Sequence, residues 1–329
     1  MTAPISALPW YKAGVQRGSA DVDEGGAPSW SPARGVEIIA GTPRGGGQDR
    51  TARALAEALG SVLEVPIEVS NVAGRGGGNA WDLLAVRQGD GHVLSISSPT
   101  LLTNPITGIS DLGFDRLTQV ARLHTEYILF AVPAGSSLAT AADLIDGSHN
   151  WDALTVAFAT AKGNINHIAL AQLCRHSGSD ARNLAVRVFD SAPQAAADVL
   201  AGNADLVAVT AASLVPQISD GSLRALAVSG PSRLAAPFDG VPCWKDLGVD
   251  CDVGTWRGVV GAPGLSASAL VFWENAIGAA VATVEWCESL VRHLWSDTSL
   301  GPVDTHEFMR NEHLVMQAAL TDLGLTELS

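Results

Sequence analysis

The feature that most constrains the fold is a unit in which an apolar run, a glycine-rich loop and an amphipathic helix follow one another. The run from Val36 to Ala40 predicts a buried strand, and the apolar spacing from Ala52 to Leu63 predicts one face of a helix. Between them, the loop Gly41–Asp49 contains three consecutive glycines. Glycines at such a turn leave backbone N–H groups free to bind an anion, and the helix dipole favours negative charge there. A single loop of this kind is equally compatible with a merely tight turn.

The same unit recurs along the chain. A second glycine-rich loop, Asn71–Asn79, follows a second strand. Apolar runs predict strands at 67–70, 92–97, 117–123, 127–132, 154–159, 185–189, 205–209 and 223–228. The last hundred residues predict loops and helices, the helices lying at 244–247, 267–282, 284–295 and 307–320. Repeated β–α alternation predicts an α/β fold with parallel sheets covered by helices on both faces.

Polar residues at the ends of these strands form the predicted walls of a ligand site. They lie at 42–49, 71–79, 97–100, 160–167, 189–192 and 210–213. Ligands of open α/β sheets bind at the carboxyl ends of the strands, so these distant segments are expected to come together.

Composition narrows the classes of function. A chain of 329 residues suggests about two domains. The net charge of −14 argues against a nucleic-acid partner, because such binding rests on basic patches. No apolar stretch long enough to span a membrane occurs. The four cysteines lack Cys-x-x-Cys spacing, so buried free thiols are predicted, although Cys243 and Cys251 could bridge across a loop. No metal and no cofactor are predicted.

Residues 1–33 are predicted to form an irregular N-terminal arm, because glycine, proline and serine interrupt them. They contain no apolar segment followed by a cleavage site, so no secretory signal is predicted. If the chain is native as written, this favours a cytoplasmic location.

A series of short motifs then follows in a fixed order. It consists of Pro43–Asp49, Asn71 with Gly74, Gly76 and Gly77, Asp90–Gly91, Asn104–Pro105, Gly163–His167, Gly202–Leu206, Leu223–Val228, Trp256 and Ala262–Pro263. Through the order and spacing of these motifs, from about residue 35 to the C-terminus, the chain resembles the extracytoplasmic solute-binding proteins of tripartite tricarboxylate transporters, the TctC or Bug family.

The resemblance implies a periplasmic-binding-protein-like fold, in which two doubly wound α/β domains have a cleft between them. It implies that residues 34–124 plus 230–329 form domain 1 and residues 125–229 form domain 2. Family proteins bind a small carboxylate in the cleft by domain closure. The resemblance therefore implies a monomeric, periplasmic solute-binding protein, with transporter membrane subunits as partners.

The strand-end loops and the resemblance together predict the ligand-binding residues. These are Thr42, Arg44, Gly45, Gly46, Gly47, Asp49, Ser97, Ser98, Thr100, Thr160, Ala161, Lys162, Asn164, His167, Asp190, Ser191, Ala192, Thr210, Trp256 and Arg257.

Four charged residues depart from the family pattern and bear on function. If all faced the cleft, Arg44, Lys162 and Arg257 would add three cations to it, and Asp190 would add a carboxylate. Such a set would suit a more negatively charged ligand that also carries an amine or hydroxyl for Asp190. The alternative is that Arg44 and Arg257 are solvated at the rim of the cleft and pair with nearby acids.

Three residues are candidates for acid/base chemistry: Asp49, His167 and Asp190. Carboxyl and imidazole groups in a closing cleft have pKa values that the surroundings can tune. For His167 the alternative is a helical residue that packs inside. The main prediction is a solute-binding protein for a small carboxylate. An enzyme acting on a small carboxylate in the same cleft, in a leaderless cytoplasmic relative, is the first alternative, and a cytosolic ligand sensor or docking protein is the second.

Overall fold

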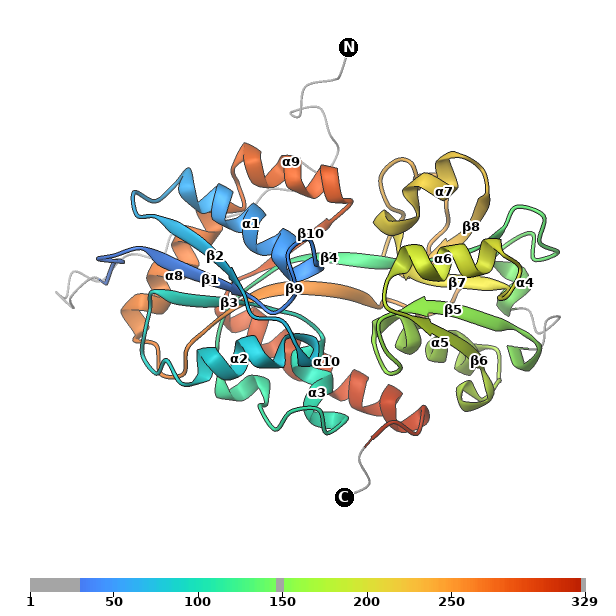
Figure 1. Cartoon of the computed structure of the whole chain (residues 1–329), viewed down its shortest axis with the longest axis horizontal. Helices are drawn as coiled ribbons and strands as arrows, with labels where there is room; N and C mark the ends of the chain where they lie inside the picture. The colour runs from blue at the N-terminus through green and yellow to red at the C-terminus, as the bar shows by residue number, and fades with distance from the viewer. Residues whose placement is uncertain (1–29, 146–150, 327–329) are drawn as a thin grey trace, which may run out of the picture.

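The computed structural model describes residues 30–145 and 151–326. The chain forms two lobes that lie side by side (Figure 1). Residues 1–29 of the predicted arm lie outside the described residues. At its described end, Trp30 packs against Phe272 and Trp273 with ring centroids 5.3 and 6.2 Å apart. This contact ties the start of the described chain to the first lobe.

The first lobe contains a mixed sheet in which three strands are parallel. Its strands, in spatial order, are β2 (Ile67–Asn71), β1 (Val36–Ala40), β3 (Val93–Ser97), β9 (Gly254–Gly261), β4 (Thr118–Pro133) and β10 (Ser296–Leu300). One face packs on α1 (Gly47–Gly60), α8 (Ala267–Ala280) and α9 (Val284–His293). The other face packs on α2 (Gly78–Ala85) and α3 (Thr100–Ile106). Helices on both faces bury the sheet, as parallel strands require.

The second lobe contains a smaller mixed sheet. Its strands, in spatial order, are β6 (Ala185–Phe189), β5 (Thr155–Ala159), β7 (Leu206–Thr210), the end of β4, and β8 (Leu223–Val228). One face packs on α4 (Ala142–Ile145), α5 (Ile165–His176) and part of α10 (Pro302–Asp322). The other face packs on α6 (Ala192–Leu200) and α7 (Val215–Ser219). Two sheets with helices on both faces confirm the predicted α/β fold class.

Short 3₁₀ turns connect several of these elements. They are η3 (Arg75–Gly77), η4 (Phe114–Arg116), η5 (Trp151–Ala153), η6 (Ala181–Asn183), η7 (Ala211–Leu214) and η8 (Trp244–Leu247).

Strand β4 belongs to both sheets. The sequence predicted two strands here, at 117–123 and 127–132, but the structure has one strand of 16 residues. Its first part, up to Tyr127, pairs with β9, and its last part pairs with β7 and β8. The prediction of two strands was wrong because the polar residues at 124–126 interrupt the apolar pattern without breaking the backbone pairing. These residues therefore lie where the chain crosses between the lobes.

Strands β9 and β10 were not predicted, because the last hundred residues were expected to contain loops and helices. Strand β9 contains three glycines among eight residues, a composition more typical of a loop. One of them, Gly258, lies so close to β4 that a Cβ atom on it would be 2.6 Å from the carbonyl oxygen of Ala121. The absence of a side chain at Gly258 therefore permits β9 to pair closely with β4.

The last part of the chain packs against both lobes. In α10, Met309, Met316 and Leu320 belong to the same apolar cluster as the residues of α5. Residues Leu234 to Val253 also contribute to the two clusters of the second lobe. The predicted division into 34–124 plus 230–329 and 125–229 stays a prediction, and these contacts favour a second boundary nearer residue 253.

Within the described ranges, no single helix is both long enough and apolar enough to cross a membrane. Helices α8 and α9 together meet the two criteria, but the chain bends by 69° between them. All four cysteines are free thiols: Cys174, Cys243 and Cys251 are buried, and Cys287 is partly exposed. The bridge between Cys243 and Cys251 that the sequence left open is therefore absent.

Candidate functional site

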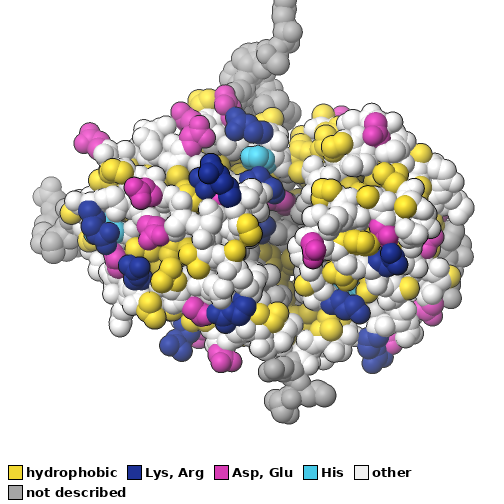
Figure 2. Space-filling model, viewed as in Figure 1, with side chains coloured by type: hydrophobic (Ala, Val, Ile, Leu, Met, Phe, Trp, Pro, Cys, Tyr) yellow, Lys and Arg dark blue, Asp and Glu magenta, His cyan; other side chains and the backbone are white. Residues whose placement is uncertain are grey.

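A cavity of about 460 Å³ lies between the two lobes. Figure 2 shows the hollow between them, with Lys and Arg side chains gathered on the first-lobe side of its upper end. The lining residues are Thr42, Gly47, Gln48, Arg50, Gly76, Ser98, Pro99, Thr100, Thr103, Glu126, Ala159, Thr160, Asn164, Ile165, Asn166, Ser191, Ala192, Pro193, Val209, Thr210, Ser213, Thr255 and Arg257.

The cavity lies at the carboxyl ends of the parallel strands of both sheets. Thr42 follows β1 and Ser98 follows β3 in the first lobe. Thr160 follows β5, Ser191 lies just beyond β6, and Thr210 ends β7 in the second lobe. Helices α1, α5 and α6 begin at this edge, and each contributes residues of its first turn to the cavity wall. Their backbone N–H groups and positive dipole ends favour an anion between the lobes.

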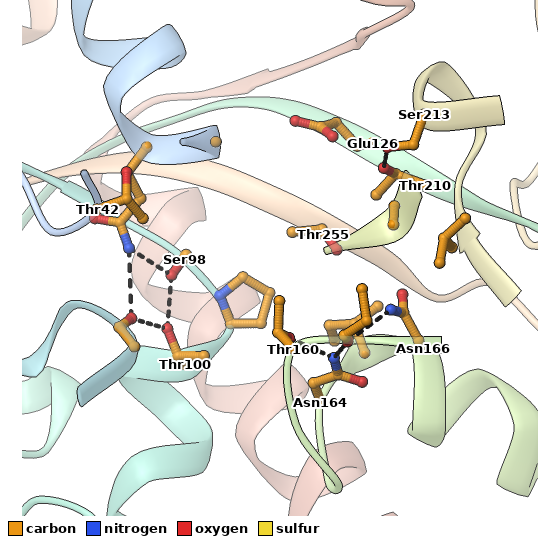
Figure 3. A pocket seen from close by; sticks show the side chains of 18 of the residues that line it. Thr42, Ser98, Thr100, Glu126, Thr160, Asn164, Asn166, Thr210, Ser213 and Thr255 are labelled. Atoms are coloured by element: carbon orange, nitrogen blue, oxygen red, sulfur yellow. Dashed lines mark hydrogen bonds between the residues drawn. The ribbon is translucent and has the colours of Figure 1, made fainter. Parts of the chain in front are cut away.

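On the wall of the first lobe, four polar groups hold one another in place (Figure 3). The amide oxygen of Gln48 accepts a hydrogen bond of 2.8 Å from the backbone N–H of Gly41. The Gln48 amide nitrogen therefore faces Ser98 Oγ, to which it donates at 3.2 Å. Ser98 Oγ lies 2.8 Å from Thr100 Oγ1, and Thr100 Oγ1 donates to the carbonyl oxygen of Gly76 at 2.5 Å. This chain of bonds fixes the polar groups before any ligand arrives.

On the wall of the second lobe, Asn164 caps helix α5. Its side-chain oxygen accepts from the backbone N–H of His167 at 3.1 Å, and its nitrogen donates to Thr160 Oγ1 at 2.7 Å. Thr160 has a φ of 78°, a region that a β-branched residue rarely adopts. Such strain is found at sites where the surrounding structure imposes it, and here it points the Thr160 side chain toward Asn164. Across the lobe, Thr210 and Ser213 form a hydroxyl pair at 2.9 Å.

Arg257 of β9 brings a positive charge to the cavity. Its Nη1 donates to the carbonyl oxygen of Trp256 at 3.1 Å, and its Nε is buried without a hydrogen-bond partner. None of the ion pairs of the described residues includes Arg257. Burial lowers the pKa of Arg257, and the charge of Glu126 counters this effect. The guanidinium is thus a partly buried cation with free donors, which favours an anionic ligand.

Glu126 of β4 brings a negative charge to the same cavity. The side chain is buried, and its Oε1 accepts a hydrogen bond of 3.1 Å from Nε1 of Trp295. The Trp295 ring is stacked on His124, with centroids 3.8 Å apart. His124 is itself fully buried and bonds to Thr51 at 2.9 Å. Glu126 is therefore held in one orientation by a packed aromatic support.

Asp49 and Arg50 lie next to each other but have different surroundings. Arg50 lines the cavity and donates from Nη1 to the carbonyl oxygen of Gly45 at 2.9 Å. Asp49 does not line the cavity, and its buried carboxylate accepts from Gly45, Asn71 and Arg53. Burial raises the pKa of Asp49, but the hydrogen bonds from Arg53, Gly45 and Asn71 together lower it. The Asp49 carboxylate therefore stabilises the glycine-rich loop without lining the cavity.

His167 also lies outside the cavity. Its Nδ1 accepts from the backbone N–H of Gly163 at 3.0 Å, and its ring is stacked on Phe158. Burial and the charge of Lys162 lower the pKa of His167 to about 4. The neutral ring packs inside the lobe, which is the alternative that the sequence left open.

The structure brings half of the predicted ligand-binding residues to the cavity wall: Thr42, Gly47, Ser98, Thr100, Thr160, Asn164, Ser191, Ala192, Thr210 and Arg257. The other predicted residues do not line it: Arg44, Gly45, Gly46, Asp49, Ser97, Ala161, Lys162, His167, Asp190 and Trp256. Of these, Arg44, Lys162 and Asp190 are exposed, and Trp256 packs in the core beside Phe308. The cavity therefore has a different set of charges from the one expected: Arg50, Arg257 and Glu126.

Sequence reasoning missed Glu126 and Thr255, which lie opposite each other on β4 and β9. In the sequence, Glu126 is distinguished only as a carboxylate directly before the apolar run 127–132. It was overlooked because residues 124–126 were interpreted as a connection between two strands. Thr255 was missed together with the whole of β9.

Comparison with known proteins agrees with this architecture. The family model described as "Tripartite tricarboxylate transporter family receptor" (TctC) matches residues 51–324. A UPF0065 protein of Bordetella bronchiseptica is 26% identical over 220 residues, which are 66% of this chain and 63% of that relative. The protein BugT of Bordetella pertussis is 26% identical over 286 residues, which are 85% of this chain and 86% of BugT.

Two solved structures share the fold. A TctC solute-binding protein from Polaromonas superposes with a TM-score of 0.76 at 23% identity, covering 89% of this chain and 99% of that one. MatC from Rhodopseudomonas palustris with bound malate superposes with a TM-score of 0.69 at 21% identity, covering 88% and 100%. The predicted resemblance is confirmed, and the chain belongs to the TctC family of tripartite tricarboxylate transporter receptors.

Proposed function

We propose that this protein is a solute-binding protein that holds a small carboxylate in the cavity between its lobes. The observation that carries the proposal is Arg257, a cavity-lining cation that has no ion-pair partner among the described residues. The first turns of α1, α5 and α6 add backbone donors around the same space. A carboxylate there would satisfy donors that the protein leaves free.

The comparisons support the class of ligand. MatC, which shares the fold, is described with malate bound. Membership of the TctC family also supports transporter membrane subunits as partners and a location outside the cytoplasmic membrane. Both statements belong to the proposal, as does closure of the lobes on the ligand, which is the usual response of such clefts.

The placement of the acid/base candidates favours binding over catalysis. The carboxylate of Asp49 is fully engaged by Gly45, Asn71 and Arg53, and the ring of His167 is packed on Phe158. Neither residue lines the cavity, and neither does Asp190. A general acid or base has to reach the proton that it transfers, so these three residues do not support the enzyme alternative.

Isothermal titration calorimetry with malate and a panel of mono-, di- and tricarboxylates tests the proposal. We expect at least one carboxylate to bind and to be recovered unchanged. Arg257→Ala should then weaken its binding about 10- to 100-fold, the value of one charged hydrogen-bonding group. Arg87→Ala removes an exposed arginine of the same lobe and should leave binding unchanged. Absence of binding by every carboxylate would refute the proposal, and recovery of an altered compound would favour the enzyme alternative.

A further inference from the structure

Glu126 is the one acidic side chain among the described residues that line the cavity. A carboxylate is an unexpected group in a site for carboxylates, because like charges repel each other strongly where water is excluded. Glu126 is only 5% exposed and lines the cavity, so the solvent that reaches its carboxylate is that of the cavity. An anion without further groups would displace this solvent and offer the carboxylate no hydrogen bond in return.

The hydrogen bonds of Glu126 are incomplete. Its Oε1 accepts from Trp295, but Oε2 has no hydrogen-bond partner within the described part of the chain. An ionised carboxylate has about four lone-pair positions, and buried ones are normally satisfied by several donors. The Trp295 ring is stacked on His124 at 3.8 Å, so the donor that engages Oε1 is held in place. The group is therefore prepared to accept a donor from the cavity.

The register of β4 and β9 places Glu126 beside Arg257. Glu126 pairs with Thr255, and His124 pairs with Arg257, so all four side chains lie on one face of the sheet. Diagonal neighbours of this kind are about 7–8 Å apart, within reach of long side chains. The two charged groups nevertheless form no ion pair with each other. Both remain available to a ligand between the lobes.

We infer that the ligand is an amino acid, in which a carboxylate for Arg257 and an ammonium group for Glu126 are attached to the same carbon atom. The ammonium supplies hydrogen bonds to Oε2 and compensates the buried negative charge of Glu126. Thr255, the cross-strand partner of Glu126 and the neighbour of Arg257 on the same face of β9, also lines the cavity beside these two groups. This inference rests on the proposed function and names the class of carboxylate that the cavity selects.

The expected selectivity follows from the cost of leaving Glu126 unsatisfied. A charged hydrogen bond contributes about 1.5–3 kcal/mol, so an amino acid should bind about 10- to 100-fold more tightly than the same acid without its amino group. A hydroxyl group donates one hydrogen bond but carries no charge, so a 2-hydroxy acid should lie between the two.

Calorimetry on matched compounds tests the inference with the full-length protein. The pairs are aspartate and succinate, glutamate and glutarate, and 2-aminoadipate and adipate, and malate is the hydroxyl analogue of the first pair. We expect the amino compound to be preferred in the pair that binds best. In Glu126→Gln the preference should fall to about 3-fold or less, because the neutral amide keeps the Trp295 bond but loses the charge. Glu68→Gln, which removes an exposed carboxylate of β2, should keep the full preference.

The outcomes separate this inference from the proposed function. If the compound without an amino group, or malate, binds best, the inference is wrong and the proposed function stands. The same holds if Glu126→Gln folds with an unchanged melting temperature and retains the preference. If neither these compounds nor any other carboxylate binds the wild-type protein, the proposed function fails and the inference fails with it.

Discussion

Two carboxylates near the cavity have opposite surroundings. Asp49 accepts from Gly45, Asn71 and Arg53, whereas Glu126 accepts from Trp295 alone among the residues that the structure describes. A carboxylate with three donors is satisfied by the protein itself and stabilises the loop that supplies them. A carboxylate with one donor has capacity left for a ligand. At the scale of single residues, the number of donors therefore separates the structural acid from the recognition group.

Asp49→Asn should destabilise the protein in a pH-dependent manner. The folded protein lowers the pKa of Asp49, so its contribution is fully present above the unfolded pKa of about 3.9 and is lost as the pH falls through the folded pKa. We expect the substitution to reduce the free energy of unfolding by about 1–3 kcal/mol at neutral pH. The difference from the wild type should be smaller at about pH 3 than at neutral pH, because about pH 3 lies below the unfolded pKa, where the contribution of a lowered folded pKa is being lost.

Urea unfolding at both pH values measures this difference. Asp111→Asn, at an exposed carboxylate, should have little effect at either pH. An equal loss at both pH values would show that Asp49 acts through packing and not through its charge.

At the scale of elements, the strand–loop–helix units were predictable because their pattern is local. The apolar runs located β1, β3 and β5, and the glycines located the start of α1. Strand β9 was not predictable in this way, because its glycines fit a neighbour, β4, that is distant in sequence. The same limit applies to the site. Polar residues at strand ends, such as Ser98 and Thr160, could be predicted, but Glu126 could be recognised only once β4 was seen to cross between the lobes.

A substitution at the start of α1 tests whether the position of the Arg257 guanidinium determines carboxylate binding. A Cβ atom on Gly47 would lie 2.5 Å from Nη2 of Arg257, which is the far end of a flexible side chain. Gly47→Ala should therefore displace the guanidinium and weaken carboxylate binding about 10-fold, the value of one hydrogen bond to a charged group. It should not unfold the protein, because alanine favours a helix over glycine.

Gly60→Ala is the matched control at the other end of α1, where a Cβ atom would have no neighbour within 4 Å. It should raise stability by up to about 1 kcal/mol and leave binding unchanged. Calorimetry and thermal unfolding of the two variants check these expectations. Unchanged binding by Gly47→Ala would show that the position of Arg257 does not determine affinity.

At the scale of the whole molecule, the two lobes are not independent units. Strand β4 pairs in both sheets, and α10 packs against α3 of one lobe and α5 of the other. Disruption of one lobe therefore removes contacts of the other, so we expect the protein to unfold in a single transition.

Leu320→Ala tests this coupling. Leu320 is fully buried near the end of α10, in the cluster formed with α5. The substitution should cost about 2–5 kcal/mol and lower the melting temperature of the one transition. Leu314→Ala lies on the same helix but is 63% exposed, and it should change stability by less than about 0.5 kcal/mol. Differential scanning calorimetry that shows two transitions, only one of them shifted, would mean that the lobes unfold separately.

The position of β9 also sets the order in which the chain can fold during synthesis. Residues 36–97 supply β1, β2 and β3 early, but β9 lies between β3 and β4 in the finished sheet and is made only at residues 254–261. Until then, one edge of β3 has no partner, and β10 follows later still at Ser296–Leu300. Pairings between such distant segments are slow to form, since a long loop must close first. The lobe that the ribosome begins first is therefore the lobe that is completed last.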